Sequence, residues 1–117
     1  MYLDANFFVF ANFASDKRGQ KARAILKSIF NGKPAITSSL ALDEVMWVLI
    51  KNEQQSELRA VIEEIYSVRN LEVKEVPSII PLRALEFMEA YKLKPRDAFH
   101  TAIMEHFGVK DIVSDDS

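Results

Sequence analysis

The sequence predicts an α/β fold in which helices flank a central, mainly parallel sheet in a three-layer sandwich. Short apolar segments that suit buried strands alternate along the chain with longer segments of helical periodicity. The helical segments are about 10 to 15 residues long, which is the length that a crossover between parallel strands requires. The chain has 117 residues, and we expect residues 1–117 to form one domain.

We expect two strands and three helices in the first half. The apolar pair Tyr2-Leu3 precedes Asp4 and suits a strand, and the short helix that follows contains four phenylalanines. The next helix repeats its apolar residues at a period of 3.6, and Asn31 with Gly32 ends it. Pro34 marks the break before the second strand, and Ser38 or its neighbour can cap the following helix. The expected ranges are a short strand that starts at the N-terminus and ends with residues 2–4, helices at 7–13 and 17–30, a strand at 34–37 and a helix at 39–51.

We expect three helices and two strands in the second half. Residues 71–76 alternate between apolar and polar side chains, which indicates a half-exposed strand. Pro95 suits the first turn of the last helix, and Gly108 suits its end. The expected ranges are a helix at 54–69, a strand at 71–76, helices at 78–92 and 95–107, and a strand at 109–113.

The composition excludes several classes of protein. Hydrophobic residues make up 49%, with only 3 Gly and 4 Pro, which excludes a disordered or collagen-like chain. The net charge of −2 argues against binding nucleic acid through a broad cationic surface, and the lack of Cys excludes disulfides and Cys-type zinc sites. No segment reaches the ~18 apolar residues of a membrane-spanning helix. We therefore expect a cytoplasmic protein with no membrane partner.

Four acidic sites, one of them a pair of adjacent residues, differ from the solvated helix faces that hold most of the 17 acidic residues. Asp4, and later Asp115 and Asp116, follow strands and so fall where active sites of parallel sheets lie. Glu44 has apolar helical neighbours, which is costly unless the carboxylate is paired, bound to metal or at a cleft. Asp97 stands in the first turn of the last helix. Each position also has an ordinary reading, as a turn, helix margin, helix start or acidic tail, but together they predict one shared cleft.

These acids lie in four short motifs that follow one another along nearly the whole chain. The motifs are YLDAN (2–6), SSLALDEV (38–45), RDAFHTA (96–102) and IVSDD (112–116). In this order the sequence resembles the PIN domain nucleases, which include the toxins of prokaryotic toxin–antitoxin pairs and archaeal PIN proteins. The resemblance implies a compact α/β sandwich around a parallel sheet, in agreement with the fold predicted from the segments themselves.

The resemblance also implies the roles of individual residues. The principal catalytic acids and metal ligands would be Asp4, Glu44, Asp97 and Asp116, with Asp115 as the alternative for the last of them. Asn6 and Ser38 match polar positions that support the site in the family. The chain stops at Ser117, inside the last motif, where the family continues. A domain truncated at its C-terminus is consistent with this difference.

The predicted cluster of carboxylates implies a bound cation. At about 5 Å, each like-charged pair costs about 3 kcal/mol at an effective dielectric constant near 20. Oxygen ligands at an open site suit Mg²⁺ or Mn²⁺. We therefore expect a metal-dependent endoribonuclease that cleaves single-stranded or structured RNA by attack of water on the phosphodiester, leaving a 5′-phosphate and a 3′-hydroxyl. From the resemblance we expect a homodimer and, if the protein is a toxin, an antitoxin partner.

Two other functions remain open from the sequence. One is a non-catalytic interaction module of the same fold. The other is an aspartate-nucleophile phosphatase or phosphoacceptor, which Asn6 disfavours because it stands where such phosphatases want a second Asp. Among the remaining residues, we expect His100 either to hydrogen-bond near the site or to pack half-buried, and Arg96 to contact the RNA backbone. Trp47 is expected in the core or at a dimer contact.

Overall fold

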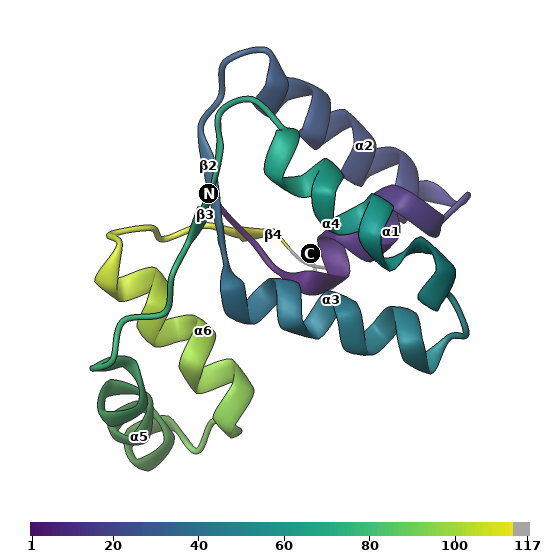
Figure 1. Ribbon diagram of the computed structural model, residues 1–117. Coiled ribbons are helices and arrows are strands. Elements are labelled where there is room, and N and C mark those ends of the chain that lie inside the picture. The colour runs from purple at the N-terminus through teal and green to yellow at the C-terminus, as the bar shows by residue number, and fades with distance from the viewer. Residues whose placement is uncertain (114–117) are drawn as a thin grey trace.

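The computed structural model describes residues 1–113 (Figure 1). Its four strands, β1 (Tyr2–Leu3), β2 (Ala35–Ser38), β3 (Leu71–Lys74) and β4 (Ile112–Val113), form one sheet in the order β3-β2-β1-β4. All three neighbouring pairs are parallel, as the sequence predicted. The first strand therefore lies inside the sheet, between β2 and β4.

Helices fill every connection between strands. Within residues 1–113, no helix is both long enough and apolar enough to cross a membrane. The helical elements are α1 (Ala5–Phe13), α2 (Lys17–Phe30), α3 (Ser39–Lys51), the 3₁₀ turn η1 (Gln55–Glu57), α4 (Leu58–Ser67), α5 (Ile80–Tyr91) and α6 (Pro95–His106).

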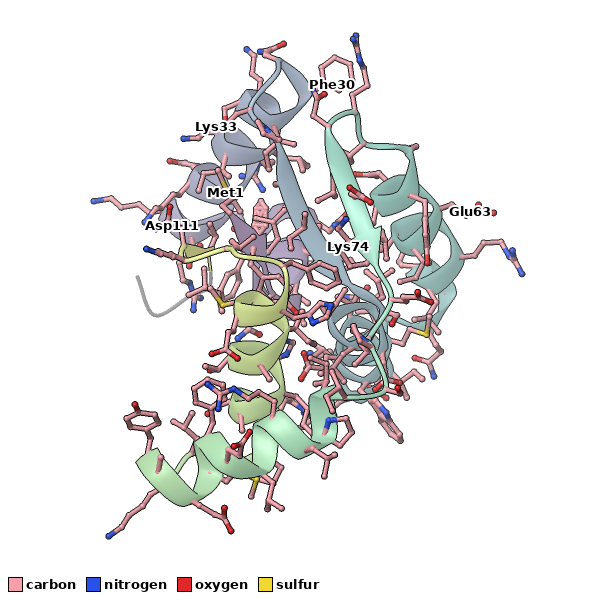
Figure 2. The ribbon with its side chains drawn as sticks, turned by 90° about the vertical axis from the view of Figure 1, so that its left-hand side faces the viewer. Met1, Phe30, Lys33, Glu63, Lys74 and Asp111 are labelled. Atoms are coloured by element: carbon pink, nitrogen blue, oxygen red, sulfur yellow. The ribbon has the colours of Figure 1, made fainter. Side chains whose placement is uncertain are left out.

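The strand order explains why the helices cover both faces of the sheet. From β1 through β2 to β3 the chain advances in one direction, and it then returns past β1 to β4. Crossovers between parallel strands are right-handed, so reversing the direction moves the connecting helices to the opposite face. Figure 1 shows α5 and α6 together on one side, with α2 and α4 on the other, and in Figure 2 α5 and α6 lie beneath the strands. The predicted three-layer arrangement is confirmed.

Each face of the sheet has its own hydrophobic core. Successive strand residues point to opposite faces. Leu3 accordingly packs with Phe7 and Phe8 of α1 in the core beneath α1 to α4, whereas Tyr2 packs against Ala98 of α6 in the other core. Tyr2 and Leu3 have no exposed surface. The strand before Asp4 is thus fixed from both sides.

Several element boundaries differ from the sequence prediction, and three of the differences have an identifiable cause. The helix expected at 54–69 begins with η1, after a reversal in which Glu53 has a φ of 59°. The edge strand β3 ends at Lys74 rather than at 76, shortly before Pro77, which has no N–H to donate. The last strand was expected at 109–113, but the Val109 N–H donates to the Met104 carbonyl at the end of α6. That residue therefore closes a helix instead of pairing in the sheet.

Candidate active site

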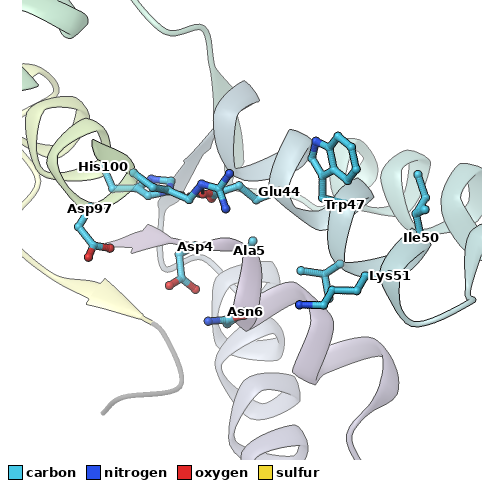
Figure 3. A pocket seen from close by; sticks show the side chains of 11 residues that line it. Asp4, Ala5, Asn6, Glu44, Trp47, Ile50, Lys51, Asp97 and His100 are labelled. Atoms are coloured by element: carbon cyan, nitrogen blue, oxygen red, sulfur yellow. Dashed lines mark hydrogen bonds and ion pairs between the residues drawn. The ribbon is translucent and has the colours of Figure 1, made fainter. Parts of the chain in front are cut away.

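A cleft of about 480 Å³ opens where β1 ends (Figure 3). Its walls come from the junction of β1 and α1, from α3, and from the first turns of α6. The carboxyl ends of β1 and β4 border the point where the strand order reverses, and ligands of open parallel sheets bind at such a point. Three of the four predicted acids line the cleft: Asp4, Glu44 and Asp97.

Asp4 is held by the transition from strand to helix. It is the N-cap of α1, and its Oδ1 accepts a hydrogen bond from the Phe7 N–H at 3.1 Å. Because Leu3 and Phe7 are buried on either side of it, the carboxylate has little freedom to leave the cleft. Asn6 lines the cleft as well, and Figure 3 shows its side chain beside that of Asp4.

Asp97 enters the cleft from the first turn of α6. Pro95 starts this helix, and the acidic side chain two residues later lies among backbone N–H groups that have no partner within the helix. The next residue, Ala98, is completely buried and fixes the rotation of the helix. Asp97 and His100 are three residues apart, so they share a helix face, and both line the cleft.

Glu44 is buried, and both of its carboxylate oxygens have a partner. Its Oε1 lies 2.7 Å from Nε2 of His100, and its Oε2 lies 2.7 Å from Nε of Arg96. The two contacts offset the cost of placing a carboxylate among the apolar neighbours on α3. The Arg96 side chain is 66% exposed, in contrast to 7% for that of Glu44, so the pair connects the protein interior with the open part of the cleft.

The polar contacts continue from His100 into the sheet. The Tyr2 hydroxyl lies 2.7 Å from Nδ1 of His100 and 2.7 Å from Oγ of Ser38. Ser38 is the N-cap of α3 and accepts from the Ala41 N–H. These four side chains, Ser38, Tyr2, His100 and Glu44, form a hydrogen-bond chain that runs from β2 to the cleft.

Hydrogen bonds donated in one continuous direction would satisfy every member of this chain. Ser38 donates to the Tyr2 oxygen, Tyr2 donates to Nδ1 of His100, and Nε2–H of His100 donates to Glu44. Burial raises the pKa of the Tyr2 phenol above its ordinary value, with smaller contributions from the charges of Glu44 and Asp4. The Tyr2 phenol therefore stays protonated and can donate a hydrogen bond.

The remaining predicted residues have different outcomes. Asp115 and Asp116 lie outside the described residues. Ser38 is a member of the hydrogen-bond chain and does not line the cleft. His100 is buried and hydrogen-bonded, which is the first of the two alternatives expected for it. The expectation that Trp47 lies in the core is wrong, because its side chain is 63% exposed and lines the cleft.

Sequence reasoning missed Tyr2. Its place in an apolar pair indicated a buried strand residue, which is correct, but gave no sign of a polar role. The available signal was the hydroxyl itself, because a buried phenol generally requires a hydrogen-bond partner.

The donors present suit a hard divalent cation. Asp4, Asp97 and Asn6 offer carboxylate and amide oxygens to the same cleft. Within residues 1–113, however, no group of three or more His, Cys, Asp or Glu side chains is placed to hold a metal ion. Mg²⁺ is commonly bound through only one or two carboxylates, with water and substrate phosphate as the other ligands. The described residues fit that manner of binding and not a closed protein cage.

Comparisons with known proteins complete these observations. The sequence matches the PIN domain over residues 1–117. The crystal structure of VapC20 from Mycobacterium tuberculosis, a sarcin–ricin loop cleaving toxin, is similar, with a TM-score of 0.79 and 20% identity over 97% of this chain and 87% of that chain. A toxin–antitoxin complex from Klebsiella pneumoniae gives a TM-score of 0.67 and 19% identity, with coverage of 97% and 83%. No curated protein matches the sequence. The two solved structures show a shared fold.

Proposed function

The chain belongs to the PIN domain family, and on this premise we propose that it is a metal-dependent endoribonuclease whose active site is the cleft beside β1. One observation carries the proposal. Asp4, Glu44 and Asp97 are distant in the sequence and come from three different elements, yet they line a single cleft. The cleft also lies at the position in the sheet where a parallel α/β fold binds ligands.

Asp4 and Asp97 are the proposed ligands of Mg²⁺ or Mn²⁺. Asn6 would support them, and Asp116, or Asp115 in its place, is proposed as the fourth acid. When bound there, the ion would neutralise the carboxylates, polarise the phosphoryl oxygen and lower the pKa of a bound water. Asp4 is suited to this role because its N-cap position fixes the carboxylate before substrate arrives.

Glu44 is proposed to contact the attacking water, and Arg96 is proposed to contact the phosphate of the substrate. Each carboxylate oxygen can accept more than one hydrogen bond. The Glu44 carboxylate can therefore orient a water molecule while it keeps its contacts with His100 and Arg96. Arg96 uses Nε for Glu44, which leaves its terminal N–H groups for a phosphate oxygen. In the proposed step the water oxygen bonds to phosphorus and gives up a proton to solvent, the bond from phosphorus to the 3′-oxygen breaks, and the 3′-oxygen takes up a proton from solvent to become a hydroxyl.

We propose RNA as the substrate, with a toxin role in which an antitoxin protein is the partner and the chain forms a homodimer. One similar structure is a toxin that cleaves the sarcin–ricin loop, and the other is a toxin–antitoxin complex. Both similarities support a toxin-like nuclease, and the single-stranded or structured form of the RNA is part of the proposal.

A non-catalytic interaction module is the second candidate. It is favoured by the contacts of Glu44, whose two oxygens already have protein partners, and by the absence of a three-ligand metal group within residues 1–113. Such a module would bind a partner through the cleft without cleaving RNA in the presence of Mg²⁺ or Mn²⁺.

The decisive experiment compares cleavage of single-stranded RNA by the parent, Asp4→Asn and Asp97→Asn, with and without Mg²⁺ or Mn²⁺. We expect cleavage only with metal, and a loss of about 100-fold or more in each variant, the scale of removing one group that stabilises transition-state charge. Asp43→Asn is the matched control, because Asp43 is an exposed acid beside Glu44 that does not line the cleft. Unchanged melting shows that the variants fold. Metal-independent cleavage, or full activity in both variants, would refute the proposal.

A further inference from the structure

We propose that Trp47 is a stacking platform for a base of single-stranded RNA, and that Arg96 and Lys51 contact the phosphates adjoining that base. The inference rests on the proposed nuclease function and specifies how the cleft recognises its substrate. It assigns a binding role to an aromatic side chain that the catalytic chemistry does not use.

Trp47 occupies a part of α3 that faces substrate rather than the core. It follows Glu44 by three residues, an axial rise of about 4.5 Å, and the two side chains line the same cleft. Figure 3 shows the indole at the rim next to Glu44. The side chain is 63% exposed, and residues 1–113 provide it with neither a hydrogen bond nor a stacked ring. A large apolar ring is therefore presented to solvent within one helical turn of Glu44.

The charges around Trp47 favour a nucleic acid as the occupant. Lys51 lines the cleft one turn further along α3 and forms no ion pair within the described part of the chain. Figure 3 shows its side chain reaching from α3 toward Asn6. Arg96, at Glu44, has terminal N–H groups that are not used by the carboxylate. A flat ring with two nearby cations matches the base and phosphates of a single strand. An apolar peptide would cover the ring but leave Lys51 without a counter-charge.

The composition provides a direct probe, because Trp47 is the only tryptophan in the sequence. Its intrinsic fluorescence therefore reports on this cleft alone. The measurement uses the full chain carrying Asp97→Asn, which prevents hydrolysis, and the parent in EDTA. Each is titrated with a single-stranded RNA hexamer and with a hexamer of the same backbone that carries no bases.

Base stacking predicts a difference between these two ligands. The hexamer with bases should quench the indole fluorescence, and the abasic hexamer should bind more weakly and leave the fluorescence nearly unchanged. Equal quenching by both would show that the ring senses phosphate rather than a base, and would overturn the inference. Absence of RNA binding to both proteins would overturn it as well.

Substitutions test the same site without relying on fluorescence. Trp47→Ala should raise the dissociation constant for labelled RNA about 5- to 150-fold, and Trp47→Phe should raise it less because a ring remains. Tyr66→Ala is the matched control: Tyr66 is 62% exposed on α4 and does not line the cleft, so its loss should leave binding unchanged. Parent-like RNA affinity in Trp47→Ala contradicts the inference. A changed oligomeric state with unchanged RNA affinity would identify Trp47 as a protein contact instead.

The two proposals fail in different ways. If Asp4→Asn abolishes cleavage while Trp47→Ala keeps the parent's KM, the nuclease proposal stands and the stacking platform does not. If the parent cleaves no RNA but the hexamer quenches Trp47 only when it carries bases, the binding site stands and the nuclease proposal fails.

Discussion

The hydrogen-bond chain from Ser38 through Tyr2 and His100 to Glu44 connects the interior of the sheet to the cleft. Its links all measure 2.7 Å, and its members are buried. Groups in such surroundings are costly to leave without a partner, so removing one member affects its neighbours more than the lost bond alone would indicate. The side chain of Glu44 is therefore held by His100 of α6, which is itself held by Tyr2 of β1.

Tyr2→Phe should lower the free energy of unfolding by about 1–3 kcal/mol at neutral pH, because Ser38 and Nδ1 of His100 lose their buried partner. Tyr91→Phe is the control, since Tyr91 is 68% exposed. Urea denaturation measures both. An unchanged free energy of unfolding in Tyr2→Phe would mean that the hydroxyl contributes nothing to the fold.

The same variant has a predicted pH signature. Burial raises the pKa of Tyr2 in the folded state, so above about pH 10 the unfolded chain loses the phenolic proton first. The stability that Tyr2 provides is present below that pH and is lost as the pH rises, by up to about 1.4 kcal/mol per pH unit. Tyr2→Phe should therefore lose less stability than the parent between pH 9 and pH 11, roughly the range in which the free phenol titrates.

At the level of secondary structure, α2 shows how a tertiary contact overrides helix propensity. Gly19 lies inside the first turns of this helix, where alanine is usually more stable by about 1 kcal/mol. A Cβ atom at Gly19 would lie 1.9 Å from the carbonyl oxygen of Ala14, which is far inside contact distance. The glycine is therefore required by the close approach of the loop between α1 and α2.

Gly19→Ala should reduce the free energy of unfolding by about 1–3 kcal/mol, the typical effect of forcing an extra carbon into a packed site. Ser28→Ala, at an exposed position of the same helix, is the control and should be neutral or slightly stabilising. Thermal melting followed by circular dichroism compares the two. A stabilised Gly19→Ala variant would show that the loop moves freely away from α2.

The secondary structure was largely predictable because it depends on local patterns. Helical periodicity and the stop at Asn31 and Gly32 located α2, and Ser38 caps α3 as expected. The end of the chain was harder to predict. The segment at 109–113 has the composition of a strand, but a hydrogen bond to the preceding helix uses part of it. The pattern of side chains does not indicate whether a backbone N–H will bond to a helix carbonyl or to a neighbouring strand.

The site was predictable only in part, because its polar contacts connect distant positions. The placement of Asp4 and Asp97 in one cleft followed from strand ends and helix starts in a parallel sheet. The partners of Glu44 did not, since Glu44 and His100 are 56 positions apart and Arg96 had been expected to face RNA. Pairings across such separations depend on how helices rotate against the sheet, which one sequence does not specify.

At the scale of the whole molecule, ion binding should appear as increased stability. A ligand that binds only the folded state at 100 times its dissociation constant raises the free energy of unfolding by about 2.7 kcal/mol. Mg²⁺ or Mn²⁺ should thus raise the melting temperature of the parent and of Asp43→Asn. The increase for Asp97→Asn should be much smaller. Equal shifts in all three proteins would place the ion elsewhere.

The strand order has a consequence for how the protein is made. The cleft takes one wall from the junction of β1 and α1 and another from α6, and β1 acquires its neighbour β4 only after α6 has been synthesised. During translation the amino-terminal acid emerges long before its counterpart at Asp97. A nascent polypeptide still attached to the ribosome at that stage has only part of the proposed binding site, so the proposed attack on RNA must await the synthesis of α6.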